Sequence, residues 1–224
     1  MFNLKNALAS GLKHISYVQV VLVVLSTIGI IYATSANRLI FNLREESVLP
    51  AGFHILHIFS ALQSDTVASL LPIIAALPCA GKYIDDVKSK FARFFLIRTN
   101  YSIYLVSRVL VCFLSGGLVI FTGTLLAWGV STLLFLPMER AEEAQSGSAA
   151  LLLRTCALLF LNGGLWAVLG TTMSTVMESK YIAYCSPFIV YYLLIILYER
   201  YFPNAWLLYP KNWLNPEIWP YGIG

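Results

Sequence analysis

Charge is scarce in this sequence of 224 residues. Only 12% of the residues are charged, while 58% are hydrophobic, and an ordinary soluble domain carries roughly 25% charged residues. A soluble domain of this length buries only about 70–75% of the surface that its unfolded chain exposes, so it could not hide this much apolar surface. The composition therefore excludes a water-soluble fold and predicts an all-α, polytopic membrane protein in which a single domain spans residues 1–224.

Cysteine motifs are also missing. None of the four cysteines is spaced as CxxC, and all lie in or beside apolar runs, which favours a role as small core residues: Cys79, Cys112, Cys156 and Cys185. Histidine is rare too. His54 and His57 form an H-x-x-H pair with Glu45 and Glu46 nearby, but a zinc site needs three or four ligands, so we predict no metal site and interpret the pair as amphipathic helix surface.

A phosphate-binding loop of the Walker type is absent from the sequence. Gly81-Lys82 is followed by Tyr83 where Ser or Thr is needed, and Ala76 stands where the first glycine belongs. We therefore expect that the chain itself is not an enzyme that hydrolyses ATP through such a loop.

Long uncharged runs are what the sequence has in abundance, and they predict five transmembrane helices. The second of them must start near His57 to be long enough, which places Asp65 inside a helix that Pro72 and Pro78 should kink or end. Residues 1–17, whose leucines recur at helical spacing, are predicted to form an interfacial helix. The expected spans are residues 18–35, 57–81, 104–128, 155–177 and 181–198.

The basic residues predict the orientation of these spans, because basic residues are enriched in cytoplasmic loops. With the N-terminus in the cytoplasm, the inner side carries nine of the 15 basic residues: Lys5, Lys13, Lys82, Lys88, Lys90, Arg93, Arg98, Arg108 and Lys180. Most acidic residues then fall on the outer side. We expect a multi-pass protein of the plasma membrane with a cytoplasmic N-terminus and no affinity for nucleic acid.

The predicted cytoplasmic loop, residues 81–100, contains a short amphipathic helix. Its apolar positions recur at helical spacing: Ile84, Val87, Phe91, Phe94 and Phe95. Asp85 and Asp86 lie in its first turn and Lys90 and Arg93 toward its end, which complements the helix dipole. Such a helix either docks on a partner protein or lies on anionic lipid.

A run of short motifs between residues 69 and 124 resembles the type 2 permeases of ABC transporters, which are membrane subunits of ATP-driven exporters. The motifs that carry the resemblance are Leu71-Pro72, Ala76-Leu77-Pro78, Asp85-Asp86, Arg98, Tyr101, Tyr104, Arg108 and Ser115-Gly116-Gly117. Such permeases usually have six spans, so the five spans counted here depart from the family pattern toward the C-terminal end of the sequence.

The resemblance implies a role for the cytoplasmic loop. In that family the loop between the second and third spans carries a coupling helix, here residues 84–95, which fits a cleft in a separate ATPase subunit. The residues implied in ATPase coupling are Ile84, Asp85, Asp86, Val87, Lys90, Phe91 and Phe94. ATP and Mg²⁺ would be bound by that partner subunit, and a second permease subunit, identical or related, would complete the path.

Asp65, Asn162 and Thr171 are the polar residues within the spans that we take as candidates for a translocation path. Asp65 and Arg154 are ionisable at similar depth, so they either pair, line a path or extend to the interface. Asn162 and Thr171 belong to a stripe of small and weakly polar residues, which suits either close helix contact or a lining.

The sequence thus predicts the transmembrane subunit of an exporter for a hydrophobic or amphipathic substrate such as a peptide, lipid or drug. Two alternatives stay open. One is an accessory or immunity protein that binds a partner helix in the bilayer, and the other is a membrane-embedded enzyme, which would need a convergent set of acids, bases or metal ligands.

Overall fold

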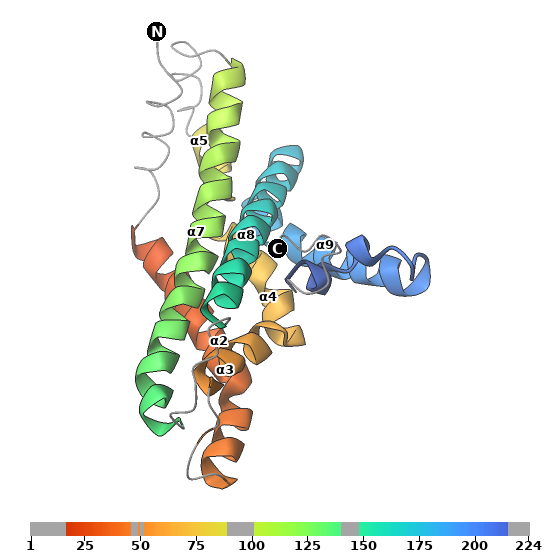
Figure 1. Ribbon diagram of the computed structural model, residues 1–224. Coiled ribbons are helices and arrows are strands. Elements are labelled where there is room, and N and C mark those ends of the chain that lie inside the picture. The colour runs from red at the N-terminus through yellow and green to blue at the C-terminus, as the bar shows by residue number, and fades with distance from the viewer. Residues whose placement is uncertain (1–16, 46–48, 50–51, 89–100, 140–147, 215–224) are drawn as a thin grey trace.

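The computed structural model describes residues 17–45, 49, 52–88, 101–139 and 148–214, and these form a bundle of helices (Figure 1). Four helices are long and apolar enough to cross a membrane: α2 (Tyr17–Glu45), α7 (Tyr101–Phe135), α8 (Ser148–Met177) and α9 (Lys180–Arg200). The expected interfacial helix of residues 1–17 lies outside the described residues, except that Tyr17 opens α2. Within the described residues, the prediction of an all-α fold with several helices long and apolar enough to cross a membrane is thereby confirmed.

The part of α2 that is long and apolar enough to cross a membrane, Tyr17–Ala36, agrees with the predicted span of residues 18–35, but the helix itself is longer. The helix α2 continues to Glu45 and includes Arg38 and Arg44, which the sequence placed in a loop. That boundary was wrong because charge alone does not end a helix. No glycine or proline interrupts this stretch before Pro50, so nothing in its covalent structure breaks the backbone hydrogen bonds.

The predicted second span is broken. It consists of α3 (Phe53–Leu62) and α4 (Asp65–Ala76), which meet at a bend of 72°. The expectation of a continuous helix through Asp65 was therefore wrong. Ser64 caps α4, since its Oγ accepts a hydrogen bond from the Val67 N–H at 3.3 Å, and a capping serine starts a helix instead of continuing one. If the bent pair counts as one span, the chain has up to five.

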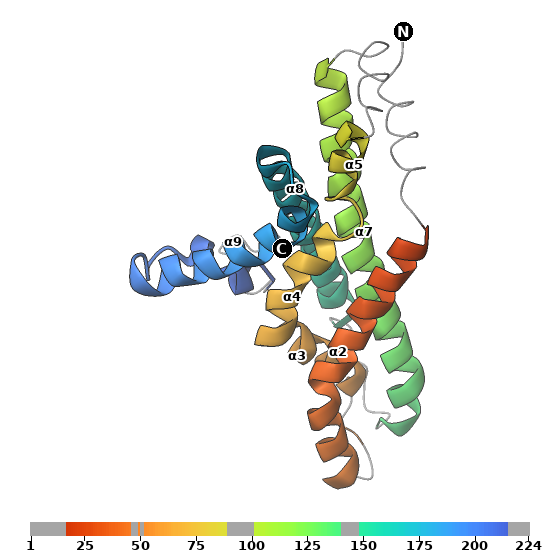
Figure 2. The same cartoon turned by 180° about the vertical axis from the view of Figure 1, so that it is seen from behind.

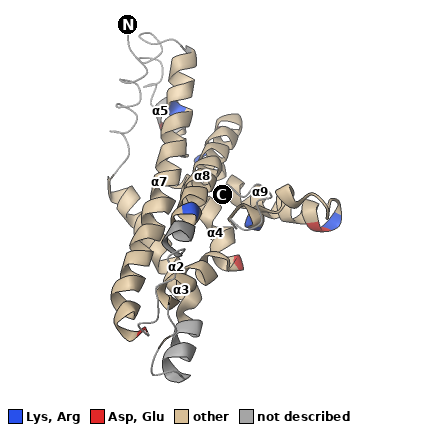
Figure 3. Cartoon of the chain, viewed as in Figure 1, with Lys and Arg blue, Asp and Glu red and all other residues tan. Residues whose placement is uncertain are grey.

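The connections group at two ends of the bundle as the sequence predicted. At one end α4 leads through a turn to the short helix α5 (Lys82–Lys88), whose Asp85 meets Lys180 at the start of α9. At the other end Leu49 pairs with Glu139, which follows α7 and the short helix η1 (Leu136–Met138). Figure 3 shows that α7 is uncharged over most of its length.

Glycines set the spacing of the central helices. A Cβ at Gly116 of α7 would lie 2.8 Å from the Gly163 carbonyl oxygen of α8 and 2.9 Å from the Ala75 carbonyl oxygen of α4. Real Cβ atoms do not approach that closely, so α4, α7 and α8 touch through their backbones here. The small-residue stripe that the sequence offered as a packing surface is used as one.

The last helix leaves the bundle sideways. In both views α9 runs across the direction of α7 (Figures 1 and 2). The tail beyond it turns back as η2 (Trp206–Leu208) and η3 (Pro210–Leu214), and η3 packs against α8. Trp213 stacks on Trp166 of α8 with ring centroids 5.8 Å apart, so the aromatic tail covers protein as well as reaching the surface.

Candidate functional site

The turn between α4 and α5 is packed against both helices of the α8–α9 hairpin. Ala76 and Ala80 are fully buried together with Ala183 of α9, and Tyr184 packs onto this cluster. Ser174 of α8 donates a hydrogen bond from its Oγ to the Ala80 carbonyl oxygen at 3.3 Å. The turn is therefore held by a neighbour on each of the two helices.

The helix α5 adds two further links to the same hairpin. The Asp85 carboxylate forms an ion pair with the Lys180 ammonium, and α5 also packs against α8. The Ile84 side chain is only 3% exposed. At Gly81, which precedes α5, the Tyr184 hydroxyl lies so close that any side chain there would force Tyr184 to shift. We call residues 76–88, together with Ser174, Lys180 and Tyr184, the junction.

The structure places the implied coupling residues unevenly. Ile84 is buried inside the chain and so does not belong to a free docking face. Asp85 is about half exposed and faces Lys180. Asp86 and Val87 lie in α5, but their side chains are outside the described residues, as are Lys90, Phe91 and Phe94 entirely.

Two cations, Lys82 and Arg108, lie near each other at the junction. Partial burial lowers the pKa of the Lys82 ammonium, and the nearby Arg108 guanidinium lowers it further, whereas Cys79 and Asp85 act in the opposite direction. Arg108 in turn lies over the Tyr104 ring, 5.5 Å from its centroid.

At the opposite end of the bundle, Glu139 connects the segment after α7 with the start of α3. Its carboxylate accepts hydrogen bonds from the Gly52 N–H at 3.1 Å, the His54 N–H at 2.7 Å and the His54 Nδ1 at 2.7 Å. Burial pushes the pKa of Glu139 upward, but these hydrogen bonds outweigh it, and the pKa lies below its ordinary value. The arrangement fastens the start of α3 to the end of α7.

The histidine pair is divided between two partners. While His54 contacts Glu139, the His57 Nε2 is hydrogen-bonded to the Ser35 hydroxyl of α2 at 3.0 Å, and its ring packs against Phe53 and Phe135. No group of three or more metal-binding side chains occurs in the described part of the chain. The two histidines therefore join elements of the fold, and His57 is buried instead of lying on the surface as predicted.

The three candidate path residues are not brought together. Asp65 stands at the start of α4, is largely exposed and forms an ion pair with Lys211 of the tail. Thr171 is buried in α8, and its hydroxyl donates a hydrogen bond to the Ala167 carbonyl oxygen at 2.7 Å. Asn162 is also buried, and its side-chain oxygen has no hydrogen-bond partner among the described residues.

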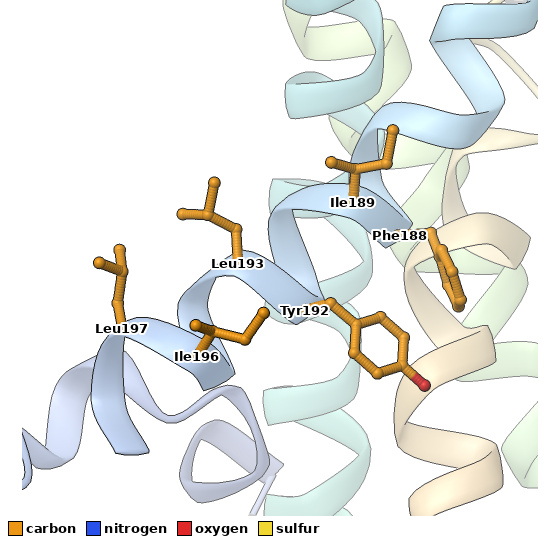
Figure 4. A pocket seen from close by; sticks show the side chains of 6 residues that line it. All are labelled: Phe188, Ile189, Tyr192, Leu193, Ile196 and Leu197. Carbon is orange, nitrogen blue, oxygen red and sulfur yellow. The ribbon is translucent and has the colours of Figure 1, made fainter. Parts of the chain in front are cut away.

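A shallow apolar groove of about 510 Å³ runs along α9. Figure 4 shows its lining residues spaced along one stretch of that helix, with only the Tyr192 hydroxyl as a polar atom: Phe188, Ile189, Tyr192, Leu193, Ile196 and Leu197. A surface of this composition suits lipid chains or an apolar partner helix.

Sequence reasoning missed Lys180, Tyr184, Lys211 and Glu139 as contact residues. Lys180 had a detectable signal, because it is the only cation in the short turn between the last two spans. The sequence contains no such signal for Glu139 and Lys211. Their partners lie far away in the sequence, and the packing of the helices brings them into contact.

Comparison with known proteins yields no relative: no family model, no curated protein and no solved structure matches the chain.

Proposed function

We propose that this chain is the transmembrane subunit of an ATP-driven exporter of the ABC type. It works in the plasma membrane, with its N-terminus in the cytoplasm, beside a second permease subunit of the same or a related sequence. Cytoplasmic ATPase subunits bind ATP and Mg²⁺ and supply the energy. The cargo is hydrophobic or amphipathic, such as a peptide, a lipid or a drug.

The observation that carries the proposal is the junction. A short helix at the end of a broken span is useful for energy coupling only if a push on it reaches other helices. Here α5 continues into α4 on one side and is tied to the α8–α9 hairpin by Asp85 and Lys180 on the other. A displacement of α5 by a partner would therefore move two separate parts of the bundle.

Such an arrangement fits the physical requirement for transport. ATP binding must favour one arrangement of the membrane helices over another, and the difference in contacts between the two states provides the driving force. Backbone contacts at Gly116 hold α4, α7 and α8 together in the arrangement described above. The proposed cycle requires a second arrangement in which these contacts loosen, and the bend before Asp65 is one place where the chain can flex.

Asn162 supports a path through the bundle. A buried amide oxygen without a partner costs about 1–3 kcal/mol, and a residue that costs stability is retained when it serves a purpose. In the proposed cycle Asn162 gains water or substrate as a partner when α8 separates from its neighbours. Thr171 and Asp65 stay in the proposal as further polar groups on the path.

One observation favours a second candidate, an accessory or immunity protein that binds a partner helix within the bilayer. The helix α9 runs sideways out of the bundle (Figure 1), and the groove along it is lined by apolar side chains (Figure 4). A partner helix could lie there without any ATPase being involved. The two candidates differ in whether an ATPase is bound.

The decisive experiment is purification of the chain from its native membranes in mild detergent, followed by identification of the proteins that accompany it. We expect an ATPase with wild-type protein and its loss with Phe91→Asp, which charges the apolar face of the coupling segment. Phe202→Asp is the matched control, because Phe202 is an exposed phenylalanine beyond the end of α9. Absence of an ATPase under every mild condition, or equal retention in Phe91→Asp, would refute the proposal.

A further inference from the structure

Two cysteines from separate elements meet beside the junction. Cys79 lies in the turn between α4 and α5, and Cys112 lies in α7; each is about 2% exposed, and with Val111 they form one packed cluster. Their thiols are close enough to interact directly. The chain's other two cysteines stand apart from this cluster, Cys156 buried in α8 and Cys185 exposed on α9.

The surroundings of Cys79 favour its reactive form. Interaction with the Cys112 thiol lowers the pKa of the Cys79 thiol, burial opposes this, and the Ser115 hydroxyl with the cations Arg108 and Lys82 lowers the pKa further. A thiolate beside positive charge is the form that attacks peroxides and disulfides. Because both cysteines are buried, an oxidant must be small, such as a peroxide, and must enter the bundle to reach them.

We propose that Cys79 and Cys112 are a redox pair that a peroxide oxidises to a disulfide between the α4–α5 turn and α7. The Cys79 thiolate attacks a peroxide oxygen, the O–O bond breaks, and a sulfenic acid forms while the alcohol or water leaves. The Cys112 thiol then attacks that sulfur, the S–S bond forms, and water leaves. Two thiols are oxidised and one peroxide is reduced, and a thiol reductant that reaches the disulfide reverses the reaction by exchange.

The bond would act on the junction directly. Cys79 lies within the turn that Ser174 and Tyr184 hold, three residues before Lys82 begins α5. A covalent link from this turn to α7 ties the short helix to the longest helix of the bundle. Oxidation therefore restricts the movement of α5, whatever partner α5 serves, so the inference does not depend on the proposed function.

The test is thiol counting on the full-length protein in detergent. Wild-type protein and the variants Cys79→Ser, Cys112→Ser and Cys156→Ser are treated with hydrogen peroxide, denatured and alkylated, and intact masses and linked peptides are recorded. We expect wild-type protein to lose two of its four alkylatable thiols and to yield a linked peptide that joins Cys79 to Cys112. A reducing agent restores both thiols.

The variants separate this pair from unspecific oxidation. Cys156→Ser should still lose two thiols, whereas Cys79→Ser and Cys112→Ser should form no disulfide within the chain. The inference is overturned if peroxide leaves all four wild-type thiols free, if the linked peptide joins other cysteines, or if the loss is not reversed by reduction. Because wild-type protein and Cys156→Ser retain the pair, the result stands even where a serine variant fails to fold.

Discussion

The Asp85 carboxylate is paired with the Lys180 ammonium, and this contact joins the short helix α5 to the first residue of α9. The two residues are far apart in the sequence and lie in the two connections that charge patterning assigns to the same side of the membrane. Their contact makes the α8–α9 hairpin the structural neighbour of the α4–α5 turn. Any force on α5 is consequently shared by two helical units.

Removing or exchanging the charges of Asp85 and Lys180 tests whether their ion pair holds α5 in place. Asp85→Asn or Lys180→Gln should speed hydrogen exchange in residues 82–88 by about two- to five-fold, a modest effect because the pair is solvent-exposed. The double variant Asp85→Lys with Lys180→Asp should return the exchange toward the wild-type rate. Hydrogen exchange followed by mass spectrometry measures this, and additive effects in the double variant would show that the two residues do not interact.

Gly116 should not tolerate any side chain. A Cβ there would meet backbone oxygens of Gly163 and Ala75 and the Ala167 methyl group, none of which can move away alone. We expect Gly116→Ala to lower the free energy of unfolding by about 3 kcal/mol or more, as overpacking against backbone does. Thermal unfolding in detergent measures the change.

The matched control is Gly129→Ala in the same helix. A Cβ at Gly129 would have no atom within 4 Å, and alanine favours a helix over glycine by about 1 kcal/mol. The control should therefore unfold at the same or a higher temperature than the wild type. Equal thermal stability of Gly116→Ala and Gly129→Ala would contradict the close packing of α4, α7 and α8.

Hydropathy was enough to predict most of the spans. The turn at residues 178–180 and the helices on either side of it appear where the uncharged runs placed them, because a charged turn between two apolar runs has few alternatives in a bilayer. The distribution of basic residues among the connections also predicted which connections lie at the same end of the bundle. Contacts such as Asp85 with Lys180 and Leu49 with Glu139 agree with that grouping.

The break before Asp65 was beyond the reach of hydropathy. Both α3 and α4 are apolar, so a window average joins them, and the length requirement of a span drew the prediction across Ser64. The local signal was a capping serine followed by an acidic residue. The sequence alone allowed either one continuous helix or two helices separated at Ser64. In the structure the two helices have separate contacts, because α3 packs against α7 and Asp65 of α4 pairs with Lys211 of the tail.

Glu139 should make the stability of the connection between the end of α7 and the start of α3 depend on pH. Since its pKa is lower in the folded protein than in the unfolded chain, its contribution is complete above the ordinary glutamate pKa of about 4.3 and is lost as the pH falls through the folded value. Glu139→Gln should lower the unfolding temperature at pH 7, and the difference from the wild type should shrink below about pH 4. A difference that grows on acidification would contradict the role given to the carboxylate.

Replacing Asn162 should change the stability and the activity of the protein in opposite directions. Replacing it by leucine, a side chain of similar shape, removes a buried oxygen that has no partner among the described residues, so Asn162→Leu should raise the free energy of unfolding by about 1–3 kcal/mol. If Asn162 belongs to the path, the ATP turnover of the purified complex should fall or lose its response to cargo at the same time. A destabilised variant would show that the amide has a partner in the folded state.

The most direct measurement places a photo-crosslinking amino acid at Lys88, the exposed last residue of α5, and identifies what it captures in native membranes. Leu133, which is 80% exposed near the other end of α7, provides the control position. The proposed function predicts that the probe at position 88 captures an ATPase subunit and that the probe at position 133 does not. Capture of lipid alone at position 88, or of the same protein from both positions, would contradict the assignment of α5 as the contact with an ATPase.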